Sequence, residues 1–286
     1  ASEKQISIPK LIKSKVEIDG KLDDTVWARA AEVRDFHQVR PNEFQASSRE
    51  TQVWLFYGDS HLYVAARLYD SPDNIVANQF IQGRAIDNDD GFRIILDGFQ
   101  NRRTGALFQL NPNGVRSEAL VENATLHHDW QTLWQGASNI DEQGWTVEMA
   151  IPFQSLSFSE QAKTWGVNFS RIIKRYNEIS AWSSHGIDSP DTAPAVAGSM
   201  NAPEVQSLAL GFDLQVSAVA RHQAPYLGES DSSLEPSVDV FYKPSSDLTL
   251  AATVNTDFSG TDVDDRVVNL SRYSLFTPEK RSFFLQ

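Results

Sequence analysis

The feature that most constrains the fold is a series of short β-rich runs, each closed by turn residues. Two of these runs, 51–57 (TQVWLFY) and 61–70 (HLYVAARLYD), are separated by Gly58, Asp59 and Ser60. β-Branched and aromatic residues on both sides of a Gly-Asp turn are typical of a β-hairpin. Further runs occupy residues 92–97, 106–111, 144–151, 165–175 and 178–182. The pattern predicts an all-β fold, with an antiparallel β-sandwich over residues 1–208.

Alternation within the runs predicts which side chains face the core of this sandwich, because successive side chains of a strand point to opposite faces. Helical signals are few. Residues 23–31 are expected to form a short helix opened by acidic residues, with a loop as the alternative. The side chains expected to face inward are Trp54, Phe56, Tyr63, Ile94, Leu96, Phe108, Val147, Ile151, Val167 and Phe169.

The sequence pattern changes after a Pro-, Ser-, Gly- and Ala-rich stretch at 183–204, which is either a long loop or a linker. Longer alternating segments follow at 212–218, 237–242 and 247–255. Such alternation is typical of membrane-barrel strands, although a soluble sheet shows it as well. Residues 209–286 are therefore expected to form β-hairpins, including one over 238–254. They are too few to close a barrel, which needs about eight strands.

Net charge excludes one class of partner and favours others. The 286 residues carry a formal net charge of −13, and nucleic-acid binding relies instead on clustered Lys and Arg. The acidic balance is compatible with cations and with neutral ligands such as sugars. The absence of cysteine excludes disulfides and thiolate metal sites. The start Ala1-Ser2-Glu3 resembles a terminus left by signal-peptide removal, so export is expected.

Five phrases occur in order at residues 18–27, 53–70, 90–97, 144–152 and 165–169, and together they resemble carbohydrate-binding module family 9. They match an opening I-D-G-x-x-D-x-x-W, a strand pair ending in Asp, a D-x-x-x-I-x-x-D strand, a G-W-x-x-E-x-x-I-P strand, and an x-G-x-N-x strand. This resemblance implies a β-sandwich that binds a saccharide or glycan without catalysis.

The tail resembles a narrower family, in which such a module is joined to a bacterial outer-membrane β-barrel. Its phrases are 255–259 (NTDFS) and 268–285 (VNLSRYSLFTPEKRSFFL). The resemblance implies that this chain is the front of a longer protein, exported to the outer membrane, the periplasm or the cell surface. The full-length protein would then be inserted in the outer membrane through a C-terminal β-barrel, of which residues 209–286 form only the first strands. Phe276, Phe283, Phe284 and Leu285 are then the apolar side chains most in need of cover.

The family resemblance implies where a sugar would bind. Sugar-binding members clamp a sugar ring between two Trp side chains. In this sequence the first clamp position falls near Asp87, the family's sugar-binding Glu falls on Arg93, and its Arg falls on Gln109. No Trp occurs in 183–200, where the second clamp is expected. Trp130 and Trp134, which flank a turn, are a replacement platform or ordinary core.

Two further groups of residues could carry chemistry. Asp87, Asp89 and Asp90 form an acidic cluster of the type that holds calcium through carboxylates and carbonyls. Structural calcium is also implied by the resemblance, and the alternative is a solvated acidic turn. Glu148, Arg171, Arg175 and Glu178 could meet on one face as a hydrolase site or as a structural ion-pair network.

Three classes of function remain open after this reading. The leading one is a non-catalytic saccharide-binding module of a bacterial cell-envelope protein. The second is a structural domain of an outer-membrane barrel, acting as a plug, a lid or an assembly contact. The third is an enzyme associated with glycoside hydrolysis. The resemblance favours the first class, and the missing Trp clamp favours the second.

Overall fold

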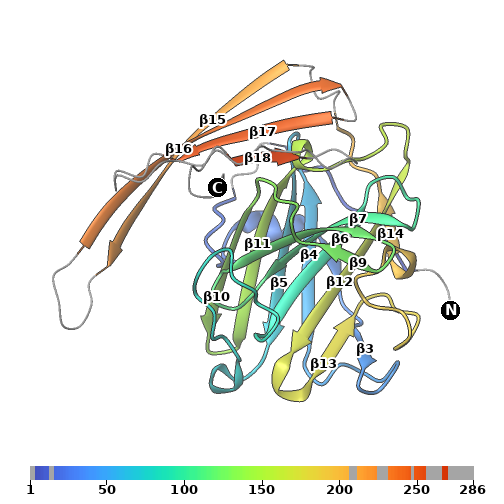
Figure 1. Cartoon of the computed structure of the whole chain (residues 1–286). Coiled ribbons are helices and arrows are strands. Elements are labelled where there is room, and N and C mark those ends of the chain that lie inside the picture. Colours follow the sequence, from blue (N-terminus) through green and yellow to red (C-terminus); the bar gives the residue numbers. More distant parts are fainter. Residues whose placement is uncertain are drawn as a thin grey trace, which may run out of the picture. The chain divides into compact units, whose positions relative to one another are not determined.

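The fold is all-β, as predicted. The computed structural model describes residues 4–12, 16–205, 211–223, 231–245, 248–255 and 266–269. The chain divides into two units, Ala1–Gln206 and Ser207–Gln286 (Figure 1). None of the helices in the described residues is long and apolar enough to cross a membrane. They are single 3-10 turns: η1 (Thr25–Arg29), η2 (Pro72–Asn74), η3 (Phe153–Ser155), η4 (Lys174–Tyr176) and η5 (Pro194–Val196).

The larger sheet of the first unit, called sheet A, has nine strands. Its strand order is β1-β14-β12-β6-β7-β8-β9, and β13 and β3 extend it from β12. All of these pairs are antiparallel except β1 with β14, which is parallel. The strands are β1 (Gln5–Ile6), β3 (His37–Arg40), β6 (Gly91–Asp97), β7 (Thr104–Leu110), β8 (Arg116–Glu122), β9 (Thr125–His127), β12 (Thr164–Ile173), β13 (Glu178–Ala181) and β14 (Gly198–Asn201).

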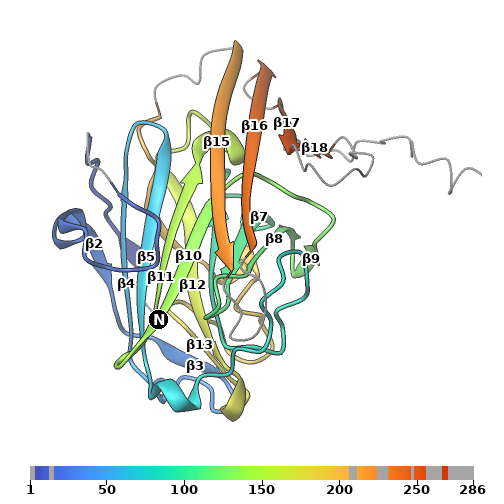
Figure 2. The ribbon, with the colours of Figure 1, turned by 90° about the vertical axis from the view of Figure 1, so that its left-hand side faces the viewer.

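The second sheet of this unit, sheet B, has five antiparallel strands in the order β10-β11-β5-β4-β2. Figure 2 shows these strands side by side. The predicted hairpin over 51–70 is confirmed, because Thr51 to Tyr57 pair with Leu68 to Leu62. The strands are β2 (Ala31–Val33), β4 (Thr51–Tyr57), β5 (His61–Tyr69), β10 (Gln135–Asp141) and β11 (Gly144–Pro152).

One face of sheet A is turned toward sheet B, and the contacts identify it. Arg171 of β12 donates hydrogen bonds to the carbonyls of Glu50 and Tyr69, at the ends of β4 and β5. A Cβ added to Gly136 of β10 would lie 3.0 Å from Leu110 of β7. Arg171 and Leu110 therefore point inward. Their strand neighbours point to the opposite face, called here the outer face of sheet A.

The inner strands β4 and β11 of sheet B are buried on both faces, and this corrects part of the core prediction. Trp54, Phe56 and Tyr63 do not face sheet A but form a second apolar layer with Trp27. The ring centroids of Phe56 and Trp27 are 5.3 Å apart, and those of Phe56 and Tyr63 are 4.8 Å apart. The N-terminal segment covers the face of sheet B that would otherwise meet water. Because both faces of these strands then carry apolar side chains, the alternation of apolar and polar residues does not show which face packs on sheet A. The predicted helix at 23–31 is present as the single turn η1.

The second unit contains a four-stranded antiparallel sheet in chain order. The predicted hairpin over 238–254 is present, with Val238 opposite Val254. Phe276, Phe283, Phe284 and Leu285 lie outside the described residues. The strands, drawn in orange and red in Figure 1, are β15 (Gly211–Gln223), β16 (Asp231–Ser245), β17 (Leu248–Asn255) and β18 (Arg266–Asn269).

Candidate functional site

A row of polar side chains crosses the outer face of sheet A. Arg93 of β6 lies directly opposite Gln109 of β7 on one side and Ser170 of β12 on the other. Ser117 of β8 is opposite Gln109 and extends the row. Residues paired across strands share a face and lie within side-chain reach of one another. The structure therefore brings Arg93 and Gln109 together, as the family alignment implied.

Asp191 completes this row from the segment that follows β13. Its Oδ2 accepts a hydrogen bond of 2.5 Å from the Ser170 hydroxyl and lies 3.4 Å from Nε of Arg93. Both charged side chains are largely buried. The guanidinium and the carboxylate therefore compensate each other's charge, and the row has no net charge.

Two donors of the row, Nε of Arg93 and Nε2 of Gln109, make no hydrogen bond among the described residues. Nε of Arg93 still has an ion-pair partner, the Asp191 carboxylate at 3.4 Å, whereas Nε2 of the buried Gln109 has no partner within the described part of the chain. A buried donor without an acceptor costs about 1–3 kcal/mol. Such a donor requires an explanation, for example water or a ligand that supplies the missing acceptor. The partly exposed members of the row, Arg93 and Ser117, are the groups that a polar, uncharged ligand could reach first.

Asn168 of β12 fixes the segment that carries Asp191. Its Nδ2 donates to the carbonyls of Ser183 and Asp191, at 2.9 Å and 3.0 Å. Its Oδ1 accepts a hydrogen bond from the Ser183 amide. The x-G-x-N-x phrase thus places an amide side chain that holds the segment 183–191 on the outer face of sheet A. This stretch is an anchored loop and not a linker between domains.

Trp130 and Trp134 lie in the interior, so the structure agrees with ordinary core and not with an exposed platform. Their relative exposures are 7% and 4%. Both rings pack edge-on against Phe108, with centroid distances of 6.1 Å and 5.2 Å. Nε1 of Trp134 also donates to the Glu118 carboxylate. The burial leaves no exposed aromatic face at these positions on which a sugar ring could stack.

Two of the three carboxylates proposed for calcium, Asp89 and Asp90, already accept protein hydrogen bonds. Asp89 accepts from the amides of Asn78 and Gln79, at 2.9 Å each, and from Nδ2 of Asn111. Asp87 is exposed, and its neighbour Asp89 is buried. The described residues contain no group of three or more acidic, His or Cys side chains that could hold a metal ion. These residues do not fit the expected calcium ion.

Asp90 has a similar anchoring function. Its Oδ1 accepts a 2.7 Å hydrogen bond from the amide of Lys174, and its Oδ2 accepts from the amide of Val76. Burial raises the pKa of Asp90, and the two amide hydrogen bonds act in the opposite direction. Asp97, at the other end of the D-x-x-x-I-x-x-D phrase, accepts amide hydrogen bonds from Phe99, Asn101 and Arg102. Both carboxylates of this phrase therefore hold loops.

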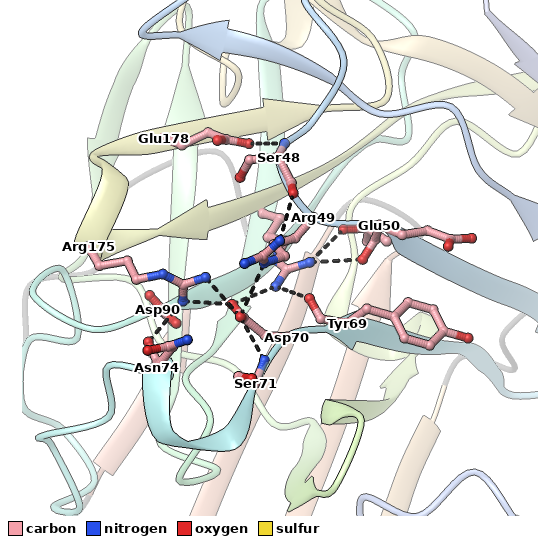
Figure 3. Close-up of polar contacts among 12 residues, drawn as sticks. Ser48, Arg49, Glu50, Tyr69, Asp70, Ser71, Asn74, Asp90, Arg175 and Glu178 are labelled. Carbon is pink, nitrogen blue, oxygen red and sulfur yellow. Dashed lines mark hydrogen bonds and ion pairs between the residues drawn. The ribbon is translucent and has the colours of Figure 1, made fainter.

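Asp70 is the centre of an ion-pair network at one end of the sandwich (Figure 3). It accepts two hydrogen bonds from Arg175, at 2.7 Å and 2.8 Å, and lies 3.5 Å from Nη2 of the buried Arg171. Burial tends to raise the pKa of Asp70, but the hydrogen bonds from Arg175 and Ser71 lower it below its ordinary value. Burial also lowers the pKa of Arg171 to about 10. The network ties β5 to β12.

Glu148 belongs to a separate cluster, on the outer face of sheet B. Its carboxylate accepts hydrogen bonds from the amides of Asp19 and Gly20, at 3.2 Å and 3.0 Å, and from Nε1 of Trp27, at 2.9 Å. Burial raises the pKa of Glu148 to about 7. The G-W-x-x-E phrase therefore holds the I-D-G-x-x-D-x-x-W phrase against sheet B.

The hydrolase hypothesis required Glu148 to meet Arg171, Arg175 and Glu178, and the structure does not bring them together. Glu178 instead accepts hydrogen bonds from the Ser180 hydroxyl and the Ser48 amide. These side chains belong to three separate sets of contacts: Glu148 holds the N-terminal segment, Arg171 and Arg175 bind Asp70, and Glu178 binds Ser48 and Ser180. None of these contacts positions a pair of carboxyl groups across a common opening.

Comparisons with known proteins agree with the geometry. The model of the carbohydrate family 9 binding domain-like family matches residues 18–181, more than half of the 286 residues. The chain belongs to this family. A search of curated proteins gave no significant match. Among solved structures, one is a carbohydrate-binding module of family 9 from Caldicellulosiruptor kristjanssonii in complex with cellotriose. Its identity is 16% and its TM-score 0.50, over 72% of this chain and 97% of the other.

A second solved structure is a candidate carbohydrate-binding protein from Bacteroides uniformis. It is 14% identical, has a TM-score of 0.56, and matches 70% of this chain and 99% of the other. At these identities the likeness establishes the fold of the family 9 sandwich. The family phrases identified in the sequence all lie in this fold, and their buried polar side chains anchor its loops.

Sequence reasoning missed Ser170 and Asp191 as parts of the polar row. Ser170 is one residue before Arg171 in β12, and alternation alone assigns it to the face opposite Arg171. Asp191 lies in a stretch without periodicity, so no local pattern identified it. Its position beside Arg93 follows from the contacts of Asn168, which are made after the sheet has formed.

Proposed function

We propose that the first unit is a non-catalytic module that binds a saccharide on the outer face of sheet A. The observation that carries this proposal is the Arg93–Gln109 pair: Nε2 of Gln109 has no acceptor among the described residues, and the partly exposed Arg93 lies directly opposite it. Sugar hydroxyl groups supply acceptors of this kind. Family membership supports the proposal. Since Asp191 compensates the charge of Arg93, the preferred ligand is a neutral saccharide and not an acidic one.

The test is calorimetric titration with a panel of neutral oligosaccharides that begins with cellotriose, the ligand in the related structure. Gln109→Ala and Arg93→Ala are expected to lower the affinity about tenfold or more, because each removes a hydrogen bond in a buried site. Arg103→Ala is the matched control, since Arg103 is exposed and lies outside the row. Unfolding curves of all variants check that the sandwich is intact. Wild-type affinity in Gln109→Ala would contradict this site.

We also propose that the chain is exported and belongs to the bacterial cell envelope, where the second unit begins an outer-membrane barrel. Support comes from the antiparallel order of its strands and from the lengths of β15 and β16, 13 and 15 residues. A membrane-spanning β-strand needs about 9–11 residues. Fractionation of native cells with an antibody against this chain tests the proposal. Recovery from the cytosol would contradict it.

A structural role in the same envelope protein, as a plug, lid or assembly domain, is the second candidate. The burial of Trp130 and Trp134 favours it, because the replacement platform is absent. The family phrases favour it as well, since Glu148, Asp70 and Asn168 anchor the chain's own loops. Under this role the titrations give no binding heat with any saccharide of the panel.

A further inference from the structure

The loop that follows β3 presents an aromatic ring to solvent in an unusual backbone conformation. Phe44 is 58% exposed, and its φ is +61°. A positive φ is uncommon for residues other than Gly, and a bulky side chain in this region is a genuine outlier. Such outliers persist when the surrounding structure imposes them, and they cluster at functional sites. The ring is therefore held outward by its loop and does not contribute to the core.

Gln38 of β3 imposes this conformation through both its backbone and its side chain. Its carbonyl accepts the Phe44 amide at 2.9 Å, and its own amide donates to the Gln45 carbonyl at 2.8 Å. Its Nε2 donates to the Ala46 carbonyl at 3.0 Å, and its Oε1 accepts from the Asn42 amide. Gln38 is buried. Four hydrogen bonds from one buried residue fix the loop before any ligand arrives.

The segment 183–191 approaches this loop and places a second apolar side chain beside it. The Ile187 amide donates to the Glu43 carboxylate. Gly186 has a φ of +103°, and a Cβ added there would lie 2.9 Å from Oε1 of Glu43 and 3.4 Å from Cζ of Phe44. Only glycine permits this close approach without strain. The next residue, Ile187, is 52% exposed.

The same segment connects this apolar pair to the polar row of sheet A. Asp191, which contacts Arg93 and Ser170, is four residues after Ile187. Four residues of extended chain span at most about 14 Å. An oligosaccharide of sufficient length can therefore contact the apolar pair and the polar row at the same time.

We propose that Phe44 and Ile187 form an apolar platform on which one ring of the bound saccharide stacks. This inference rests on the proposed function. Aromatic faces stack on the C–H faces of sugars while neighbouring polar groups bind the hydroxyls, and the Glu43 carboxylate is adjacent. Two side chains are too few for a stable protein interface, which buries at least about 1,000 Å². Glu43 and Asp188 beside the pair disfavour an anionic lipid surface.

The test is titration of the full chain with the panel of neutral oligosaccharides used above. Phe44→Ala is expected to lower the affinity about tenfold with an unchanged melting temperature, and Phe44→Trp is expected to restore it. Phe99→Ala is the matched control, because Phe99 is 43% exposed in the turn between β6 and β7.

Three results would overturn the platform. Wild-type affinity in Phe44→Ala, together with loss of binding in Gln109→Ala, would reject the platform and leave the proposed function intact. A wild-type chain that binds no saccharide of the panel would reject both. Binding of the wild type to phosphatidylcholine vesicles that Phe44→Ala abolishes would assign the apolar pair to a membrane surface instead.

Discussion

The buried carboxylate of Glu148 makes the stability of the first unit depend on pH in an unusual direction. Burial raises its pKa from an ordinary 4.5 to about 7. A group whose folded pKa is raised stabilises the fold fully below the unfolded pKa, and this contribution is lost as the pH rises through the folded pKa. The wild type is therefore expected to lose stability between pH 4.5 and pH 7, where many proteins gain it.

The magnitude follows from the shift. One pKa unit corresponds to about 1.4 kcal/mol, so the shift from 4.5 to about 7 sets an upper limit of about 3.5 kcal/mol. Any water that reaches the carboxylate reduces this value. Glu148→Gln keeps the shape but does not titrate. Between pH 4.5 and pH 7, the free energy of unfolding of Glu148→Gln is expected to change less than that of the wild type. The difference between the two changes is expected to reach at most this upper limit.

Urea unfolding followed by tryptophan fluorescence measures the effect, because all seven Trp lie in the first unit. Titrations at pH 4.5, 5.5, 6.5 and 7.5 give the dependence for the wild type, for Glu148→Gln and for the control Glu142→Gln. Glu142 is exposed, so its replacement is expected to change stability by less than about 0.5 kcal/mol. Parallel curves for the wild type and Glu148→Gln would refute the reasoning.

Three further predictions test the anchoring contacts. Asp70→Ala leaves the buried Arg171 without its carboxylate and is expected to lower the free energy of unfolding by about 3–5 kcal/mol. The control is Arg49→Ala, which should cost less than about 1 kcal/mol because the Arg49 side chain is 41% exposed. Equal urea midpoints for the two variants would contradict this prediction. Gly20→Ala places a Cβ 2.6 Å from a backbone atom of Ser138 at a φ of +85°, whereas Gly83→Ala has a φ of +78° and no atom within 4 Å. Gly83→Ala should lower the free energy of unfolding by about 1–2 kcal/mol, and Gly20→Ala should lower it clearly more. Similar losses for the two variants would show that the backbone of Ser138 moves to make room for the added Cβ. Added calcium or a chelator should leave the melting temperature unchanged, because Asp89 and Asp90 already accept amide hydrogen bonds; a rise with calcium would restore the calcium site expected from the sequence.

The candidate site shows how far sequence reasoning reaches. Arg93 and Gln109 were found by aligning one strand phrase with the family, and the register then placed them opposite each other. Asp191 was missed because it lies in a loop without a pattern. The sequence is compatible with Trp130 and Trp134 as either a surface platform or ordinary core, and in the structure both pack on Phe108. Local sequence does not specify whether a turn projects outward or packs on the core. Here the packing partner is Phe108, which lies more than twenty residues away in the sequence.

The sequence by itself determined the strands, the hairpin over 51–70 and the family, because side-chain alternation and turn chemistry act between near neighbours. It also supplied the polar residues of the family phrases. Only the tertiary structure decided what these residues do. Glu148 meets the Gly20 amide across 128 positions of sequence, and Asn168 meets Asp191 across 23. A buried polar group must find its partner wherever the folded chain places one. For this reason residues that suggested ligand or catalytic chemistry in the sequence hold loops in the structure, and the candidate site lies where the Gln109 amide, which lacks an acceptor among the described residues, is opposite Arg93.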